Sequence, residues 1–250
     1  MTPASSAVFV MPRAPTEWGG AAALWVTVAG WADAAARRFG HSWVVTPDGT
    51  VDADAALAAA GVGTAAPAGS SQSARALARR LPTWTNTAAK DARRLVRARA
   101  RRRAGDDGRW AADVPAFVWQ DHDLFHRTGE RIASRAGVPL VSYVHAPQVW
   151  EAARWGVRRP GWGPALERYG ERPQLVASDV VACVSDEVAT TITARPSLTT
   201  ARSKWARDLG MLLRQSSSDH HGRHRSRWFL VETNAPSRTA AHTQTALLLR

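Results

Sequence analysis

The chain contains almost no cysteine, and this scarcity excludes two kinds of stabilising site. Cys183 is the single cysteine among 250 residues, so no disulfide can form within the chain. A zinc site built from cysteines needs several thiolates and is excluded as well. A chain without internal disulfides fits a reducing compartment, and we expect a cytoplasmic protein.

Long apolar runs are also missing. The longest apolar stretch near the N-terminus, Ala21 to Ala36, is interrupted by Asp33, and it is too short and too rich in alanine to span a bilayer. No basic region precedes an apolar run at the N-terminus, so we expect no signal peptide. Lysine is scarce too, since it occurs only at Lys90 and Lys204.

Positive charge is what the sequence has in excess, with a formal net charge of +12. Residues 194–250 hold ten Arg and Lys against three Asp and Glu, and seven of the eleven residues from Arg93 to Arg103 are arginine. We interpret the arginine run first as a solvated helix face or linker, as most charge runs are. Peripheral binding of Arg93–Arg103 to an anionic membrane, at its inner face, is a second interpretation. Binding of nucleic acid is the least favoured.

The first fifty residues predict a strand–helix–strand unit. Ala7 to Met11 is a short apolar run that predicts a strand, and a loop ending in Gly19-Gly20 follows it. Residues 21–38 carry apolar side chains at spacings of four, three and four, which is typical of a helix. Trp43 to Thr46 predicts a second strand, which the turn signal Pro47-Asp48-Gly49 closes.

The same alternation continues along the chain and sharpens after Pro115. We expect further strands at 116–119, 140–144 and 180–184, and helices at 51–60, 74–103, 124–136, 150–155, 164–177 and 186–192. Ser185 is the expected N-cap of the last helix. Strands that alternate with helices predict an α/β fold with a doubly wound, parallel, Rossmann-like sheet.

The alternation stops near residue 189. Residues 190–250 contain sixteen Ser or Thr and a polar cluster from His220 to Arg225. Trp228 to Val231 is an apolar run for which the sequence suggests no partner. We therefore expect a Rossmann-like domain over residues 1–189 and a largely irregular basic tail, rich in Ser, Thr, Arg and His, over residues 190–250.

Candidate site residues follow from the rule that an open parallel sheet binds ligands at the carboxyl ends of its strands. Gly19-Gly20 follows the first strand, where glycines let backbone N–H groups approach a phosphate or a sugar. Gln120–Asp123, His145 and Ser185–Glu187 follow three later strands. A histidine at such an edge can exchange a proton or bind a sugar hydroxyl near neutral pH. Each of these groups can also simply cap a helix end.

Several blocks of the sequence resemble family-4-type glycosyltransferases, which have the two-Rossmann-domain (GT-B) fold. The blocks are Phe117–His126, Gly137–Pro147, Val149–Ala153 and Ala177–Val188, with Glu17–Gly20 and Phe39–Thr46 nearer the N-terminus. The resemblance covers roughly residues 7–189. It is most specific in the combination of Gly137–Val141 with Ala177–Val188.

The resemblance implies that residues 1–189 are the N-terminal, acceptor-side half of a retaining glycosyltransferase, which moves a sugar from a nucleotide diphosphate to a sugar or lipid-linked acceptor. The nucleotide sugar is then a substrate, and no further cofactor and no metal are expected. The family assigns roles to six residues: His122 would line the reacting centre, Gly19 and Gly20 would face the donor phosphates, and Asp121, His145 and Glu151 would bind the acceptor.

Residues 190–250 depart from this family. Its second domain, which binds the donor, carries a Gly-rich strand–loop–helix and a pair of spaced glutamates, whereas Glu232 is the only glutamate in these residues. We therefore expect that a truncation or a shifted frame replaced the donor domain, and that the chain is inactive alone. Two alternatives remain: a non-enzymatic acceptor-binding or partner-subunit module, and a basic protein that binds nucleic acid or a membrane surface.

Overall fold

The computed structural model describes residues 6–14, 22–61, 82–104, 107–194 and 229–232. Gly19 and Gly20 lie outside these residues. In chain order the elements are β1 (Ser6–Val10), α1 (Ala22–Phe39), β2 (His41–Thr46), β3 (Gly49–Asp52), α2 (Ala53–Gly61), α4 (Thr83–Ala104), η2 (Arg109–Ala112), β4 (Pro115–Asp121), α5 (Thr128–Ala136), β5 (Leu140–Val144), α6 (Gln148–Arg154), α7 (Gly163–Leu166), η3 (Glu167–Glu171), α8 (Arg172–Ala177), β6 (Val180–Cys183), α9 (Asp186–Thr193) and β7 (Phe229–Glu232).

One seven-stranded sheet organises the described residues, in the order β3-β2-β1-β4-β5-β6-β7. The five inner strands are parallel, whereas β3 and β7 join its two edges antiparallel. Numbered among themselves, the parallel strands run 2-1-3-4-5, one of the two common doubly wound orders. The expected α/β, Rossmann-like fold is thereby confirmed.

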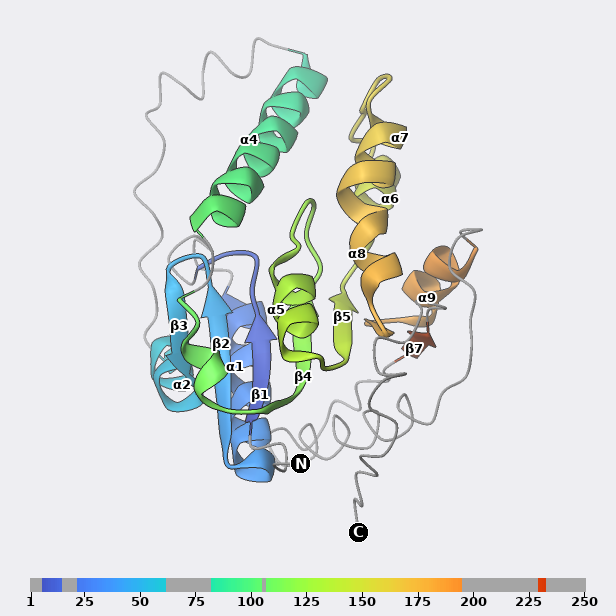
Figure 1. Cartoon of the computed structure of the whole chain (residues 1–250). Helices are drawn as coiled ribbons and strands as arrows, with labels where there is room; N and C mark the ends of the chain where they lie inside the picture. The colour runs from blue at the N-terminus through green and yellow to red at the C-terminus, as the bar shows by residue number, and fades with distance from the viewer. Residues whose placement is uncertain (1–5, 15–21, 62–81, 105–106, 195–228, 233–250) are drawn as a thin grey trace.

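Helices cover both faces of the sheet, because successive side chains of each strand point to opposite sides. Ala7 and Phe9 of β1 pack with α1 and α2 in one apolar cluster. Val8 and Val10 pack in a second cluster that includes Ile132 of α5. Figure 1 shows this layering, with α1 behind the sheet and α5 in front of it.

Aromatic side chains close the core beneath the carboxyl edge of the sheet. Trp31 of α1 meets the edges of Trp119 and Tyr143 with both pairs of ring centroids 5.1 Å apart. The rings of Trp119 on β4 and Tyr143 on β5 lie 5.3 Å apart. Edge-to-face pairs of this kind add about 0.5–1.5 kcal/mol each beyond the area that they bury. These ring contacts fix the C-terminal ends of β4 and β5 against α1.

Two expected helices begin later than the sequence suggests. The helix expected from residue 51 starts at Ala53, because β2 turns at Pro47–Gly49 into the antiparallel strand β3. The helix expected from residue 124 starts at Thr128. Phe125 has a φ of 64°, which is incompatible with a right-handed helix, and its N–H donates to the carbonyl of Gly170.

Two further differences concern the second half of the chain. The helix expected over 164–177 is interrupted by a π-helical turn, η3, which precedes Pro173. Proline has no N–H to donate into a helix, and π turns often accompany such an interruption. The apolar run at Trp228–Val231 does find a partner, since residues 229–232 form β7 and pair antiparallel with β6.

Helix α4 lies beyond the carboxyl ends of β1 and β2 (Figure 1). It begins directly after Pro82 and belongs to the helix expected over 74–103, of which residues 74–81 lie outside the described part. Asp91 anchors it, because its carboxylate accepts from Arg159 Nε at 2.8 Å and from Trp162 Nε1 at 3.2 Å. Among the described helices, none has the length and apolar character needed to cross a membrane.

Candidate functional site

The parallel sheet changes its winding direction between β1 and β4. From β1 the chain crosses to β2 on one side, and from β4 it crosses to β5 on the other. The loops that leave such a pair of strands diverge, and the crevice between them is where doubly wound sheets bind ligands. Here Pro12 and Arg13 follow β1, and His122 and Asp123 follow Asp121 at the end of β4.

Asp121 and His145 form the first pair of titratable groups at this edge. Asp121 Oδ1 lies 3.7 Å from His145 Nε2 and has no hydrogen-bond partner among the described residues. Burial raises the pKa of Asp121 well above its usual value, the charge of Asp123 raises it further, and Arg13 opposes both. Burial also lowers the pKa of His145, although 49% of its side chain is exposed. Both groups therefore favour their neutral forms, which is suited to proton exchange.

His122 and Glu171 form a second pair beneath the surface. Both side chains are fully buried, and His122 Nε2 lies 3.6 Å from Glu171 Oε1. Within the described part of the chain, neither ring nitrogen of His122 has a hydrogen-bond partner. The Glu171 carboxylate also accepts from the backbone N–H of Gln148, which starts α6. The pair thus joins the loop after β4 to the π turn and to α6.

Buried hydrogen bonds hold the loop 122–127 in place. Gln174 donates to the carbonyls of Asp123 and Gly170. The N–H of Gly129 donates to Gln120 Oε1 at 2.7 Å, and a Cβ on Gly129 would lie only 2.6 Å from the same oxygen. The close approach requires glycine at this position. The loop that carries His122 and Asp123 is therefore rigidly positioned rather than loosely attached.

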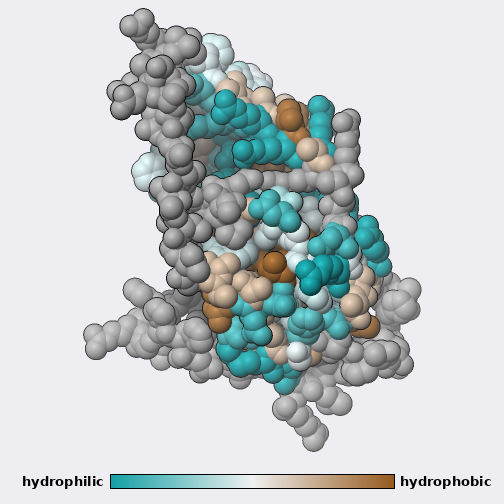
Figure 2. Space-filling model, turned by 90° about the vertical axis from the view of Figure 1, so that its left-hand side faces the viewer, coloured by the Kyte–Doolittle hydropathy of each residue, from teal (hydrophilic) through white to brown (hydrophobic). Residues whose placement is uncertain are grey.

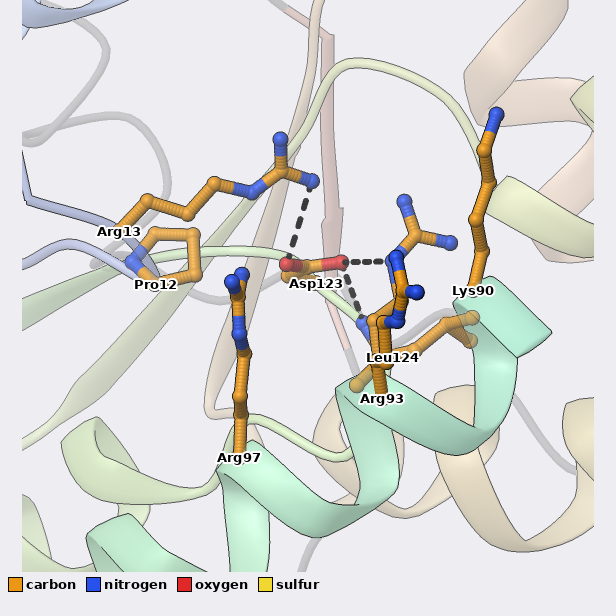
Figure 3. Close-up of a pocket in the computed structure, with 8 residues that line it drawn as sticks. Pro12, Arg13, Lys90, Arg93, Arg97, Asp123 and Leu124 are labelled. Atoms are coloured by element: carbon orange, nitrogen blue, oxygen red, sulfur yellow. Dashed lines mark hydrogen bonds and ion pairs between the residues drawn. The ribbon is translucent and has the colours of Figure 1, made fainter. Parts of the chain in front are cut away.

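A basic pocket opens between the end of β1, the loop after β4 and α4. Its lining residues are Pro12, Arg13, Lys90, Arg93, Arg94, Arg97, Asp123 and Leu124, and its volume is about 230 Å³. Lys90, Arg93, Arg94 and Arg97 are spaced i, i+3, i+4 and i+7, so α4 presents them on one face. Figure 3 shows Lys90, Arg93 and Arg97 rising from α4 on the side of Asp123 and Arg13.

Asp123 is the carboxylate of this pocket. It lies 3.5 Å from Arg13 and 3.9 Å from Arg94, and it accepts from the N–H of Leu124 and from Gln148. Burial opposes its ionisation, but the charges of Arg94 and Arg13 and these hydrogen bonds together lower its pKa. An ionised Asp123 therefore links the end of β1 to α4, as the dashed lines of Figure 3 show.

The structure brings together three of the six residues expected from the sequence, since Asp121, His122 and His145 share the carboxyl edges of β4 and β5. Glu151 is exposed on α6, and no contact among the described residues joins it to Asp121 or His145. Gly19 and Gly20 fall outside the described residues, so their assignment stays a prediction.

Sequence reasoning missed the basic pocket and Glu171. The helical spacing of the four α4 cations was a usable signal, but the run from Arg93 to Arg103 suggested a solvated face instead. The structure divides that run by position and not by exposure: Arg93, Arg94 and Arg97 line the pocket, whereas Arg99, which is exposed as Arg93 and Arg97 are, does not line it. Arg13 and Glu171 reach the site only through tertiary structure and carried no such signal.

No group of three His, Cys, Asp or Glu side chains within the described residues is arranged to hold a metal ion. Comparisons with known proteins give no match to a family model, to a curated protein or to a solved structure.

Proposed function

We propose that this chain is the acceptor-side half of a nucleotide-sugar glycosyltransferase, with its acceptor site at the carboxyl edge of β4 and β5. The observation that carries the proposal is the convergence of the segments that resemble that family. Phe117–His126, Gly137–Pro147 and Ala177–Val188 contain β4, β5 and β6, which are neighbours in the sheet and end at one edge. That edge adjoins the point where doubly wound sheets bind ligands.

The Asp121–His145 pair supplies chemistry that an acceptor hydroxyl needs. In the transfer, the hydroxyl oxygen bonds to the anomeric carbon, the bond from that carbon to the donor phosphate breaks, and the nucleoside diphosphate leaves with the electron pair. The hydroxyl proton must also depart. A neutral His145, half-exposed at the edge, can accept a hydrogen bond from that hydroxyl. Asp121, 3.7 Å behind it, can orient the ring.

His122 and Glu171 form a buried pair in the interior next to this edge. Because both side chains are fully buried, a ligand that arrives from solvent meets His145 before it meets His122. The proposal includes a nucleotide sugar as the donor and no requirement for a metal, as the resemblance implies, and a cytoplasmic location, as the single cysteine suggests. Because the resemblance assigns donor binding to a second domain, we propose that residues 6–194 bind the acceptor without release of nucleoside diphosphate from a donor.

Sugar binding by the purified chain tests the proposal. Histidine ring signals in NMR spectra would be followed while a panel of mono- and disaccharides is added, and release of nucleoside diphosphate from nucleotide sugars would be assayed in parallel. We expect a sugar to shift the His145 signal and His145→Gln to weaken binding about tenfold, the value of one hydrogen bond at the upper end of its usual range.

His41→Gln is the matched control, because His41 is also partly exposed, with 36% of its side chain accessible, but begins β2 at the opposite edge of the sheet. A panel in which no sugar moves the His145 signal, or in which His41→Gln weakens binding equally, would overturn the acceptor site. Release of nucleoside diphosphate by this chain alone would refute the expected inactivity.

A further inference from the structure

The basic pocket has a ligand chemistry of its own, separate from the Asp121–His145 edge. We infer that the cavity between Arg13, Asp123 and the cationic face of α4 binds the phosphate group of a small phosphorylated compound. The inference that this cavity binds phosphate depends only on the geometry of the cavity. Its assignment to the acceptor, which would make the acceptor a sugar or polyol phosphate, rests on the proposed function.

The charges that face the cavity leave a clear positive excess. Among the described residues, five cations line it, Arg13, Lys90, Arg93, Arg94 and Arg97, against one carboxylate, that of Asp123. Asp91, a further acid on α4, is directed to Arg159 and Trp162, although Arg94 lies 3.6 Å from it. Lys90 and Arg93 make no ion pair with any described carboxylate. Such a concentration of one sign attracts an oppositely charged ligand.

Arg13, Arg94 and the helix that carries the other three cations are held in position by contacts that would not have to change on binding. The bidentate pair between Arg159 and Asp91 fixes the rotation of α4, because Arg159 Nε and Nη2 reach its two carboxylate oxygens at 2.8 Å and 3.2 Å. Asp123 fixes the distance between Arg13 and α4. Preorganised donors lose little freedom when a ligand binds, and this favours affinity.

Phosphate is the anion that suits this arrangement best. Arginine offers several N–H donors in a fixed fork and binds phosphate oxygens in pairs, and a phosphate monoester carries close to two negative charges at neutral pH. A carboxylate would neutralise less of the excess. Figure 2 shows that the surface of the upper part of the molecule, where α4 lies, is mostly hydrophilic. Six of the eight described residues that line the pocket are charged, so an apolar ligand would find little to contact there.

The size of the cavity limits the ligand. Its volume of about 230 Å³ holds roughly seven or eight water molecules at about 30 Å³ each. Pockets for drug-sized ligands begin at about 300 Å³. The cavity therefore suits a phosphate group with a small organic moiety, and a complete nucleotide sugar exceeds it.

Calorimetric titration of the whole chain tests the inference. The probes are inorganic phosphate, glucose 6-phosphate and unphosphorylated glucose, at low and at moderate salt. We expect the two phosphates to bind, the affinity to fall with salt, and glucose alone not to bind this pocket. Arg93→Ala and Arg97→Ala should each reduce phosphate affinity about tenfold or more, as for loss of a hydrogen bond to a charged group.

Arg99→Ala is the matched control, because it removes the same charge from the same helix at an exposed position outside the pocket. Circular dichroism would verify that each variant is folded, and Lys90→Ala replaces any arginine variant that is not. Equal losses for Arg99→Ala and Arg93→Ala would overturn the pocket, since they indicate diffuse charge attraction. Absence of phosphate binding would overturn it directly.

Vesicles containing phosphatidic acid identify the source of the phosphate. Binding of these vesicles through Arg93 and Arg97, without binding of glucose 6-phosphate, would overturn a small soluble ligand in favour of a lipid headgroup. The phosphate site and the proposed function can fail separately. If sugars shift the His145 signal but phosphate does not bind, only the phosphate site is refuted. If phosphate binds but no sugar shifts the His145 signal, only the glycosyltransferase proposal is refuted.

Discussion

Replacing the buried carboxylate of Asp121 by an amide should make the protein more stable at neutral pH. The Asp121 side chain is buried, Oδ1 has no hydrogen-bond partner among the described residues, and the negative charge of Asp123 lies nearby. The pKa of Asp121 is therefore raised in the folded state. The folded chain then holds a proton that the unfolded chain has already released above its ordinary pKa of about 3.9.

The sign and size of the effect follow from this difference in bound protons. Above pH ~3.9 the free energy of unfolding falls by up to about 1.4 kcal/mol per pH unit, until the folded-state pKa is reached. For a chain of about 150–250 residues, 1 kcal/mol corresponds to about 2–4 °C in Tm. The Tm of Asp121→Asn should thus exceed that of the wild type by a gap that widens by up to about 3–6 °C per pH unit.

Thermal unfolding of both proteins, followed by circular dichroism at half-unit steps from pH 4 to 7, measures this gap. Asp54→Asn, which changes an exposed carboxylate on α2, reports the general effect of removing one charge. A gap between Asp121→Asn and wild type that stays constant across the range would refute the reasoning, because no proton would then distinguish the folded from the unfolded chain at this position.

Three other outcomes are expected. Gly129→Ala places a methyl group 2.6 Å from Gln120 Oε1, so the free energy of unfolding measured in urea should fall by about 1–3 kcal/mol. Gly30→Ala is the control, because Gly30 lies in the interior of α1 with open space around it. It should raise the free energy of unfolding by about 0.5–1 kcal/mol. Cys183 is fully buried and burial raises its pKa to about 12, so a thiol reagent such as DTNB should label it only in denaturant; rapid labelling of the native protein would contradict this. Because the pKa of His145 is lowered in the fold, stability should fall as the pH drops below about 6.5, and His145→Gln should flatten that part of the pH profile.

The parts of the site that follow directly from strand ends could be predicted from the sequence. Asp121 and His145 come immediately after apolar runs, and parallel strands bring their carboxyl ends to one edge. The onset of α5 could not be predicted, because the positive φ of Phe125 depends on Gly170, 45 positions later, whose carbonyl accepts its N–H. Glu171 reaches His122 for the same reason, through the packing of η3 against the loop.

The two antiparallel strands show a different limit. β3 has only four residues, which is too short for an alternating pattern to be distinguished from a turn. β7 pairs with a strand some fifty residues earlier in the sequence, so nothing near Phe229 indicates its partner. The pocket shows a third limit. The density of arginine after Arg93 predicts a solvated face, whereas the helical spacing that begins at Lys90 is what places the cations on one side of α4.

The cationic face of α4 makes the helix–coil equilibrium of this segment depend on the ions around it. α4 carries eight Lys and Arg and one Asp, and two like-charge pairs among its described side chains, Lys90–Arg94 and Arg93–Arg97, stand at i, i+4, which together disfavour the helix by about 0.4–1 kcal/mol. Asp91, and Asp123 through its contact with Arg94, oppose that repulsion. In dilute buffer α4 should therefore open more readily to trypsin, which cuts after Lys and Arg. A multivalent anion in the pocket should slow that cleavage well before it changes the melting of the sheet.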